Sequence, residues 1–262
     1  MRAPWPMRPA DELRDAVEAY LGTLSFAPDL GALEGPLRYS LQSGGKRVRP
    51  VLCLAVAEAA GGSVEAALPA AAALELVHTF SLVHDDLPAM DDDAVRRGRP
   101  SAHVAFGEGV ALLAGDALLA EALRLALTYE SNGVARELIG ATLGMIGGQY
   151  LDVTGDDDDL ARLHRLKTGR LFLAAVLMGL EVAGVAEDER TVWLALGDDV
   201  GLLFQVVDDL LDGDGYAARL GAEDARQLAQ EVASRARARL DELAVDTTVL
   251  RDLVDMLAVR TG

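Results

Sequence analysis

The chain has 262 residues, 51% of them hydrophobic, and a net charge of −18, so it is long enough to bury a substantial core. The negative charge argues against nucleic acid and anionic membrane surfaces as partners, because their phosphates would be repelled. No window holds the roughly 18 uninterrupted apolar residues of a membrane-spanning helix, and the first residues lack the apolar core of a secretory signal, so we expect a cytoplasmic protein without a membrane span.

The composition and the spacing of Gly and Pro residues favour an all-α fold. Alanine, leucine, arginine and glutamate recur, aromatic residues make up only 5%, and runs of β-branched residues are nearly absent. Gly and Pro divide the chain into helix-length pieces without a long linker, which predicts one domain over residues 1–262. Helices are expected at residues 10–22, 29–43, 48–60, 64–85, 107–130, 133–152, 157–184, 187–212, 216–243 and 246–259.

Lysine is used so sparingly that both of its positions are candidate functional residues. Of 24 lysine and arginine residues, only Lys46 and Lys167 are lysines. Lys46 lies in GGKRVRP, where two glycines precede a predicted helix and backbone amides can converge on an anion together with Lys46, Arg47 and Arg49. Lys167 falls within an apolar helical stripe, where a lysine is costly to bury without an anionic partner.

The helix expected over 64–85 ends in an acidic motif, DDLPAMDDD. His78, Ser81 and Asp85 are spaced by three and four residues, so they share one face of this helix. A second acidic pair begins at Asp91. Carboxylates packed this closely at the end of an inward face repel one another unless cations neutralise them.

A second acidic motif, DDLLD, ends the helix expected over 187–212, from Asp208 to Asp212. Two facing acidic helix ends predict a magnesium site that substrate phosphates complete, because Mg²⁺ prefers hard oxygen ligands and tolerates few carboxylates. Arg96 and Arg97 follow the first motif and would join GGKRVRP in a second anion site.

A third acidic run is interpreted differently. The sequence DDDD at 156–159 follows a glycine and opens a predicted helix. Carboxylates are favourable at this end of a helix because they cap free amides and oppose the helix dipole. We therefore expect a capping role there.

Five motifs in order resemble those of the trans-isoprenyl diphosphate synthases of the polyprenyl synthetase family, closest to the bacterial short-chain type. They are GGKRVRP, HTFSLVHDDLPAMDDDAVRRGRP, GGQYLD, KTGRLF and FQVVDDLLD. The resemblance implies a single-domain isoprenoid synthase fold, a bundle of about ten or more helices around a deep central pocket, usually in a homodimer. It implies a Mg²⁺-dependent condensation of isopentenyl diphosphate with an allylic diphosphate, dimethylallyl or geranyl diphosphate. The expected product is C15 farnesyl diphosphate, with C10 and C20 as alternatives.

The resemblance also assigns residues to roles. Metal binding falls to Asp85, Asp91 and Asp208, supported by Asp86, Asp92, Asp209 and Asp212. The allylic substrate would meet Arg96 and the catalytic residues Lys167, Thr168 and Gln205, and isopentenyl diphosphate would meet Lys46, Arg49, His78 and Arg97. Phe80, next to Ser81, lies roughly 7.5 Å below Asp85 along the helix and would limit product length, although an ordinary core role for Phe80 stays open.

The sequence departs from the family after DDLLD. The family continues through a loop of the type G-K-x-x-G-K-D, whereas GDGYAARLGAEDARQLAQE contains no lysine. Arg219 is a candidate replacement for one lost phosphate contact. This departure keeps a second function open, a catalytically weak or silent subunit that modulates an active partner. A third, a class I terpene cyclase, shares the first aspartate motif and the helical fold. The motif DDLLD argues against a cyclase, because a cyclase would carry Asn/Asp, Ser/Thr and Glu metal ligands at this position.

Overall fold

The computed structural model describes residues 7–42, 44–155 and 159–259, most of which are helical. The α-helices are α1 (Ala10–Thr23), α2 (Glu34–Leu41), α3 (Val48–Ala59), α4 (Val64–Asp85), α5 (Ala102–Phe106), α6 (Glu108–Ala126), α7 (Gly133–Thr154), α8 (Leu160–His164), α9 (Arg170–Ala183), α10 (Thr191–Asp212), α11 (Gly215–Leu220), α12 (Ala222–Glu242) and α13 (Thr248–Val259). Two 3₁₀ turns, η1 (Pro28–Leu33) and η3 (Glu187–Glu189), a π-helical turn, η2 (Arg165–Gly169), and a hairpin of β1 (Val95–Arg96) and β2 (Arg99–Pro100) complete the described elements. The all-α prediction is confirmed.

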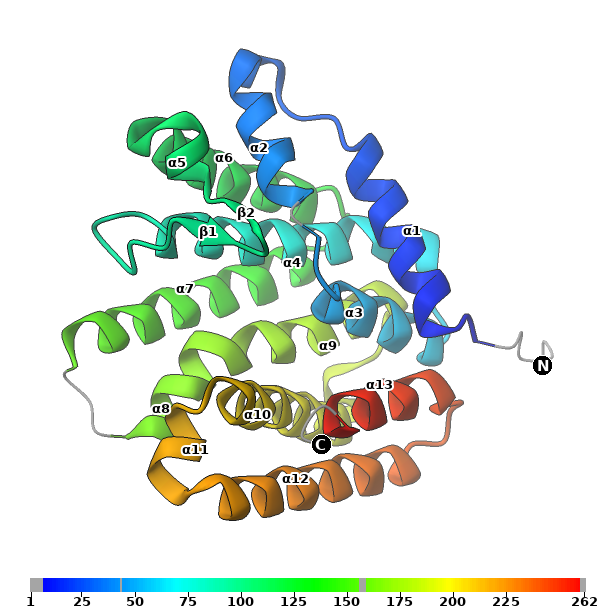
Figure 1. The fold of residues 1–262 in the computed structure, drawn as a ribbon. Coiled ribbons are helices and arrows are strands. Elements are labelled where there is room, and N and C mark those ends of the chain that lie inside the picture. The colour runs from blue at the N-terminus through cyan, green and yellow to red at the C-terminus, as the bar shows by residue number, and fades with distance from the viewer. Residues whose placement is uncertain (1–6, 43, 156–158, 260–262) are drawn as a thin grey trace.

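The helices are stacked in layers around one continuous cluster of buried apolar side chains. In Figure 1 the layers run from α2, α5 and α6 at the top, through α4, α7 and α9, to α10 and α12 at the bottom. Helix α4 packs against α3 and α6, and α9 packs against α3, α7 and α10. Small residues bring these helices close: a Cβ on Gly179 of α9 would lie 2.6 Å from the carbonyl oxygen of Cys53 on α3.

Helix α4 carries the first acidic motif to the end of this core. It begins after Ser63, whose side chain accepts a hydrogen bond from the amide of Ala66, and ends at Asp85 as the sequence predicted. The helix is long and apolar enough to cross a membrane, but 67% of its apolar window is buried inside the protein. Burial in the protein core therefore accounts for its apolar composition.

Several predicted helices are interrupted. The helix expected over 157–184 begins at Leu160 instead, and the π-helical turn η2 separates α8 from α9. Gly148 of α7 lies so close to η2 that a Cβ there would overlap the backbone of Lys167. The helix expected over 216–243 is divided at Gly221, which has a φ of 90° that other residues rarely adopt. The segments expected as helices at 29–43 and 187–212 are likewise each divided, into η1 and α2 and into η3 and α10, whereas the helix expected over 107–130 is the single helix α6, which ends at Ala126.

The hairpin after the first acidic motif was not predicted. Its two-residue turn consists of Arg97 and Gly98, with φ angles of 53° and 76°. Two successive residues with positive φ are typical of a type I′ turn, whose twist matches that of the strands. An Arg-Gly turn between two-residue strands is a weak local signal, so this hairpin was visible only in the folded chain.

Candidate functional site

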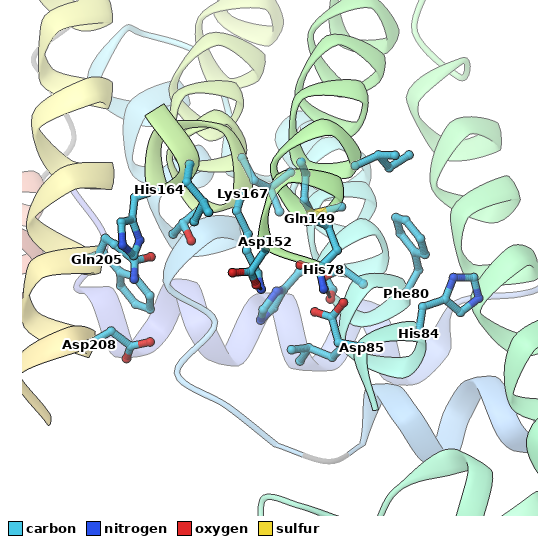
Figure 2. A pocket seen from close by; sticks show the side chains of 18 of the residues that line it. His78, Phe80, His84, Asp85, Gln149, Asp152, His164, Lys167, Gln205 and Asp208 are labelled. Atoms are coloured by element: carbon cyan, nitrogen blue, oxygen red, sulfur yellow. Dashed lines mark hydrogen bonds and ion pairs between the residues drawn. The ribbon is translucent and has the colours of Figure 1, made fainter. Parts of the chain in front are cut away.

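A cavity of about 1310 Å³ opens where α4 and α10 end. Its walls come from the start of α3 and from α4, α7, α8, η2 and α10. The expected site residues that line it are Lys46, Arg49, His78, Phe80, Ser81, Asp85, Arg97, Lys167, Thr168, Gln205 and Asp208. Figure 2 shows Asp208 and Gln205 on one side, Asp85 and Phe80 on the other, and Lys167 between them. The other two, Asp91 and Arg96, lie outside the lining.

One wall of the cavity concentrates positive charge. The guanidinium carbon of Arg49 lies 4.5 Å from the ring centre of Phe172 and 5.3 Å from that of Phe204, which is a cation–π geometry. Burial lowers the pKa of Arg49 to about 10. Burial also lowers the pKa of His78 well below its usual value, and the charges of Arg49 and Arg97 add to this effect. A neutral imidazole beside a buried guanidinium suits an anionic ligand, because an anion would offset the cost of burying the cation.

Arg47, in the same GGKRVRP segment, is engaged by the protein itself. Its backbone is left-handed, with a φ of 49°. Its side chain donates to Glu18 Oε1 at 2.8 Å and to the carbonyl oxygen of Leu41 at 2.6 Å, and it forms an ion pair with the buried Glu75. The sequence predicted that Lys46, Arg47 and Arg49 would converge on an anion. Arg47 instead fixes the start of α3, so Lys46 and Arg49 remain the candidate anion-binding side chains of this segment.

The two aspartates of the first acidic pair have different surroundings. Asp85 lines the cavity, and burial raises its pKa to about 6, with the charge of Asp91 adding to this effect. Asp86 is buried and accepts a hydrogen bond from Arg96 Nε at 2.9 Å. The amide of Asp91 donates to the carbonyl oxygen of Asp85 at 2.9 Å, which keeps the second acidic pair beside the first.

The two adjacent aspartates at the start of the second acidic motif also differ in their contacts. Asp208 and Asp209 both line the cavity, but Asp209 is only 2% exposed and its carboxylate is bound by the protein. The carboxylate of Asp209 accepts hydrogen bonds from Gln205 Nε2 at 2.6 Å and from the amide of Tyr216 at 2.7 Å. Asp212 is exposed and lies outside the cavity lining.

The carboxylates of the cavity do not form a metal cage by themselves. Within residues 7–42, 44–155 and 159–259, no three His, Cys, Asp or Glu side chains lie close enough together to hold a metal ion. Asp85 and Asp208 instead lie on different sides of the cavity (Figure 2). Separated carboxylates fit Mg²⁺ only if the substrate supplies further oxygen ligands, which is the way Mg²⁺ commonly binds phosphate esters.

Sequence reasoning missed several polar lining residues, among them Asp152, Gln149 and His164. Lys167 Nζ lies 2.5 Å from Asp152 Oδ2, so Asp152 is the anionic partner that a half-buried lysine requires. The motif GGQYLD and that requirement together were a signal for Asp152. Gln149 and His164 also line the cavity, and no local pattern distinguished them. Of the acidic run at 156–159, Asp159 caps α8 by accepting from the amide of Arg162 at 3.1 Å, and residues 156–158 lie outside the described residues.

Comparison with known proteins identifies relatives of this chain. Residues 31–234 match the polyprenyl synthetase family. The chain is 43% identical to a geranylgeranyl diphosphate synthase of Cyanophora paradoxa, over 76% of this chain and 71% of that protein. It is 35% identical to the farnesyl diphosphate synthase of Bacillus subtilis, over 87% and 89% of the two chains. A solved FPP/GFPP synthase from Zymomonas mobilis has a TM-score of 0.80 and 33% identity, covering 95% of this chain and 98% of that one.

Proposed function

Because the chain belongs to the polyprenyl synthetase family, we propose that it is a prenyltransferase that joins an allylic diphosphate head-to-tail to isopentenyl diphosphate. One observation carries the proposal: a single cavity combines a cationic wall at Arg49, carboxylates at Asp85 and Asp208, and an aromatic side chain, Phe80, lower on α4. Two diphosphates with apolar tails need these three environments together.

The cationic wall is the proposed site for isopentenyl diphosphate. Lys46, Arg49 and Arg97 would bind its diphosphate with charge-assisted hydrogen bonds. His78 would donate a hydrogen bond as a neutral imidazole, because burial holds its pKa well below its usual value. The stack of Arg49 on Phe172 and Phe204 limits the rotamers of the arginine, which lowers the entropy lost on binding.

The allylic diphosphate would lie across the acidic motifs. Asp85, Asp91 and Asp208 would hold Mg²⁺, which when bound supplies positive charge to the leaving diphosphate. The bond between the allylic carbon and the diphosphate oxygen breaks first, the π bond of isopentenyl diphosphate then attacks the resulting carbocation, and a proton leaves to the departing diphosphate. The carbon that reacts passes through a cationic state, which nearby oxygen atoms stabilise.

Lys167, Thr168 and Gln205 are the proposed residues around that cationic carbon. All three line the cavity beside Asp208 and belong to η2 and α10. Asp152 pairs with Lys167 at 2.5 Å and fixes its ammonium group, so that the ammonium group is available to the diphosphate. The apolar remainder of the lining would exclude the water that would quench the cation.

The proposed product is C15 farnesyl diphosphate, with C10 and C20 products as the alternatives. Relatives of similar identity are named for farnesyl and for geranylgeranyl products, so the choice depends on this chain's own cavity. Phe80 lines the cavity from α4 and is 6% exposed, and its ring lies edge-on to His84 at 5.4 Å. An aromatic ring in this position supports a short product, because it occupies the space below Asp85 that a longer tail would need.

The purified protein is expected to form a C15 product from isopentenyl diphosphate and dimethylallyl diphosphate when Mg²⁺ is present, and no product when Mg²⁺ is chelated. Chain-length analysis of dephosphorylated products would measure this, and geranyl diphosphate as the primer would test the second condensation separately. Absence of product from every allylic primer, in a folded protein, would contradict the proposal and favour a silent subunit that modulates an active partner.

We also propose that the protein is a homodimer. Five exposed apolar residues of α7 follow one another at spacings of four and three residues and are 44–65% exposed: Ile139, Leu143, Ile146, Tyr150 and Val153. Together with exposed Val110 and Leu113 on the adjoining α6 they form an apolar face that water contacts in the single chain. Ile146, Tyr150 and Val153 also line the cavity, so a second copy on this face would close one of its sides.

The dimer is expected to dissociate in the variant Leu143→Arg. The side chain of Leu143 is 65% exposed, so the change should leave the fold of the single chain intact while burying a charge in the contact. Light scattering should report twice the chain mass of 27.7 kDa for the native protein and the single mass for the variant. Val259→Arg, at a 77% exposed position on α13, is the matched control and should remain dimeric. A native protein of single mass would contradict the proposal.

Two further predictions from the sequence remain proposals. One is that residues 1–262 form a single domain, which the continuous cluster of buried apolar residues supports. The other is a cytoplasmic location, which is supported by the burial of α4, the one helix among the described residues that is long and apolar enough to cross a membrane. Limited proteolysis and cell fractionation, respectively, would test them.

A further inference from the structure

The segment that follows the second acidic motif, residues 213–221, is held against Asp209 through both backbone and side chain. The carbonyl oxygen of Asp209 accepts hydrogen bonds from the amides of Gly213 at 2.8 Å and Asp214 at 3.2 Å. Its carboxylate accepts from the amide of Tyr216 at 2.7 Å. Asp214 and Gly215 line the cavity, so this docked segment forms part of the cavity wall.

Two other features show how closely the segment is docked. Gly215 has a φ of 41°, and a Cβ at this position would overlap the carboxylate of Asp209. The ring of Tyr216 stacks on His164 with a centroid distance of 5.2 Å and an interplanar angle of 25°. The glycine therefore permits the hydrogen bond to Asp209, and the aromatic stack connects the segment to α8.

The second oxygen of the Asp209 carboxylate holds Gln205. Asp209 Oδ1 accepts from Gln205 Nε2 at 2.6 Å. A primary amide has one donor end and one acceptor end, so fixing the nitrogen beside a carboxylate leaves Oε1 of Gln205 as the free end. Gln205 lines the cavity, and a carbonyl oxygen there is the partner that a cationic carbon requires.

We propose that Asp209 is a positioning residue, which docks residues 213–221 at the cavity wall and orients the amide of Gln205, while Asp208 alone of this pair serves the metal. Asp209 also lines the cavity, but both oxygens of its carboxylate accept protein donors, His164 Nε2 lies 3.6 Å from Oδ2, and the residue is 2% exposed, so a cation would have to displace one of these donors. The docking part stands on the contacts alone, and the role of Gln205 rests on the proposed function.

Amide hydrogen exchange of the unliganded full-length protein tests the docking without any catalysis. In Asp209→Asn, only one end of the new amide can accept, so either Gln205 or Tyr216 loses its bond. We expect the peptide covering 213–221 to exchange at least about tenfold faster, since a hydrogen bond to a charged group contributes roughly that factor or more. Gly215→Ala should have the same effect on this peptide because its Cβ needs the space of the carboxylate.

A compensating pair of changes separates positioning from general damage. In the double variant Gln205→Glu with Asp209→Asn, the asparagine can donate to the glutamate and accept from the amide of Tyr216, so exchange in 213–221 should return to within about threefold of the native rate. Asp208→Asn is the matched control and should leave this exchange unchanged. Native exchange in Asp209→Asn, or no recovery in the double variant, would overturn the docking.

Kinetics then test the assignment of the two aspartates. Asp209→Asn is expected to lower kcat at least about tenfold while the Mg²⁺ concentration for half-maximal rate stays within about twofold. Asp208→Asn should raise that Mg²⁺ concentration. A rise of similar size in Asp209→Asn would show that Asp209 binds metal and would overturn the assignment. If the native protein were inactive, both the proposed function and the role of Gln205 would be wrong. The hydrogen-exchange result would still show whether Asp209 docks residues 213–221.

Discussion

Replacing Asp85 with asparagine is expected to lower kcat by about a thousandfold, which corresponds to about 4 kcal/mol of transition-state stabilisation. Asp85 is the carboxylate of the first motif that lines the cavity, and it is a proposed metal ligand. The loss should not come from unfolding. Burial raises the pKa of Asp85 to about 6, so its negative charge costs the folded protein free energy, and the neutral amide removes that cost. Steady-state rates over a range of Mg²⁺ concentrations, with urea unfolding of the same samples, would measure both effects.

The neighbouring carboxylate provides the control. Asp86 is 3% exposed and paired with Arg96, so Asp86→Asn should destabilise the protein by about 1–3 kcal/mol through the weakened charge-assisted bond. Because the cavity-lining carboxylate is retained, the Mg²⁺ dependence of the remaining activity should resemble that of the native protein. If Asp85→Asn kept more than a tenth of the native kcat, Asp85 could not be an essential metal ligand.

Replacing Phe80 with alanine is expected to change the main product from C15 to C20 or longer. The side chain of Phe80 lines the cavity about 7.5 Å below Asp85, at 1.5 Å of helix rise per residue, and its removal would lengthen the space for the growing tail. A larger cavity accepts further condensations because the product remains an allylic diphosphate that can serve as the next primer. Chain-length analysis at equal conversion would measure the shift.

Phe26→Ala is a matched control for the loss of a buried aromatic ring. Phe26 is 8% exposed, close to the 6% of Phe80, and lies outside the cavity lining. Both changes should cost stability, about 3–5 kcal/mol where the ring is fully enclosed and less where it faces a cavity. Only the change at Phe80 should alter product length. An unchanged product distribution in Phe80→Ala would reduce Phe80 to an ordinary core residue.

The sequence by itself determined the fold class and most of the candidate site. The helix predicted over 64–85 has these bounds in the structure, where Ser63 caps its start and the apolar segment ends at Asp85. The two lysines stood out because lysine is otherwise absent, and both line the cavity. Spacings of three and four residues were enough to place His78, Ser81 and Asp85 on one face, since these spacings follow from the geometry of the helix alone.

Only the tertiary structure decided how adjacent residues divide their roles. Asp85, Asp208 and Asp209 line the cavity, but Asp209, like Asp86 outside the lining, binds a partner that lies seven to ten residues further along the chain, in the hairpin or in α11. The partner of Lys167 likewise comes from α7. Adjacent residues on a helix differ by about 100° in direction, so a local pattern shows that a carboxylate pair ends a helix but not which member is bound by other parts of the protein. That choice depends on the groups that neighbouring elements bring close, because a buried charge is stable only where another part of the chain supplies its partner.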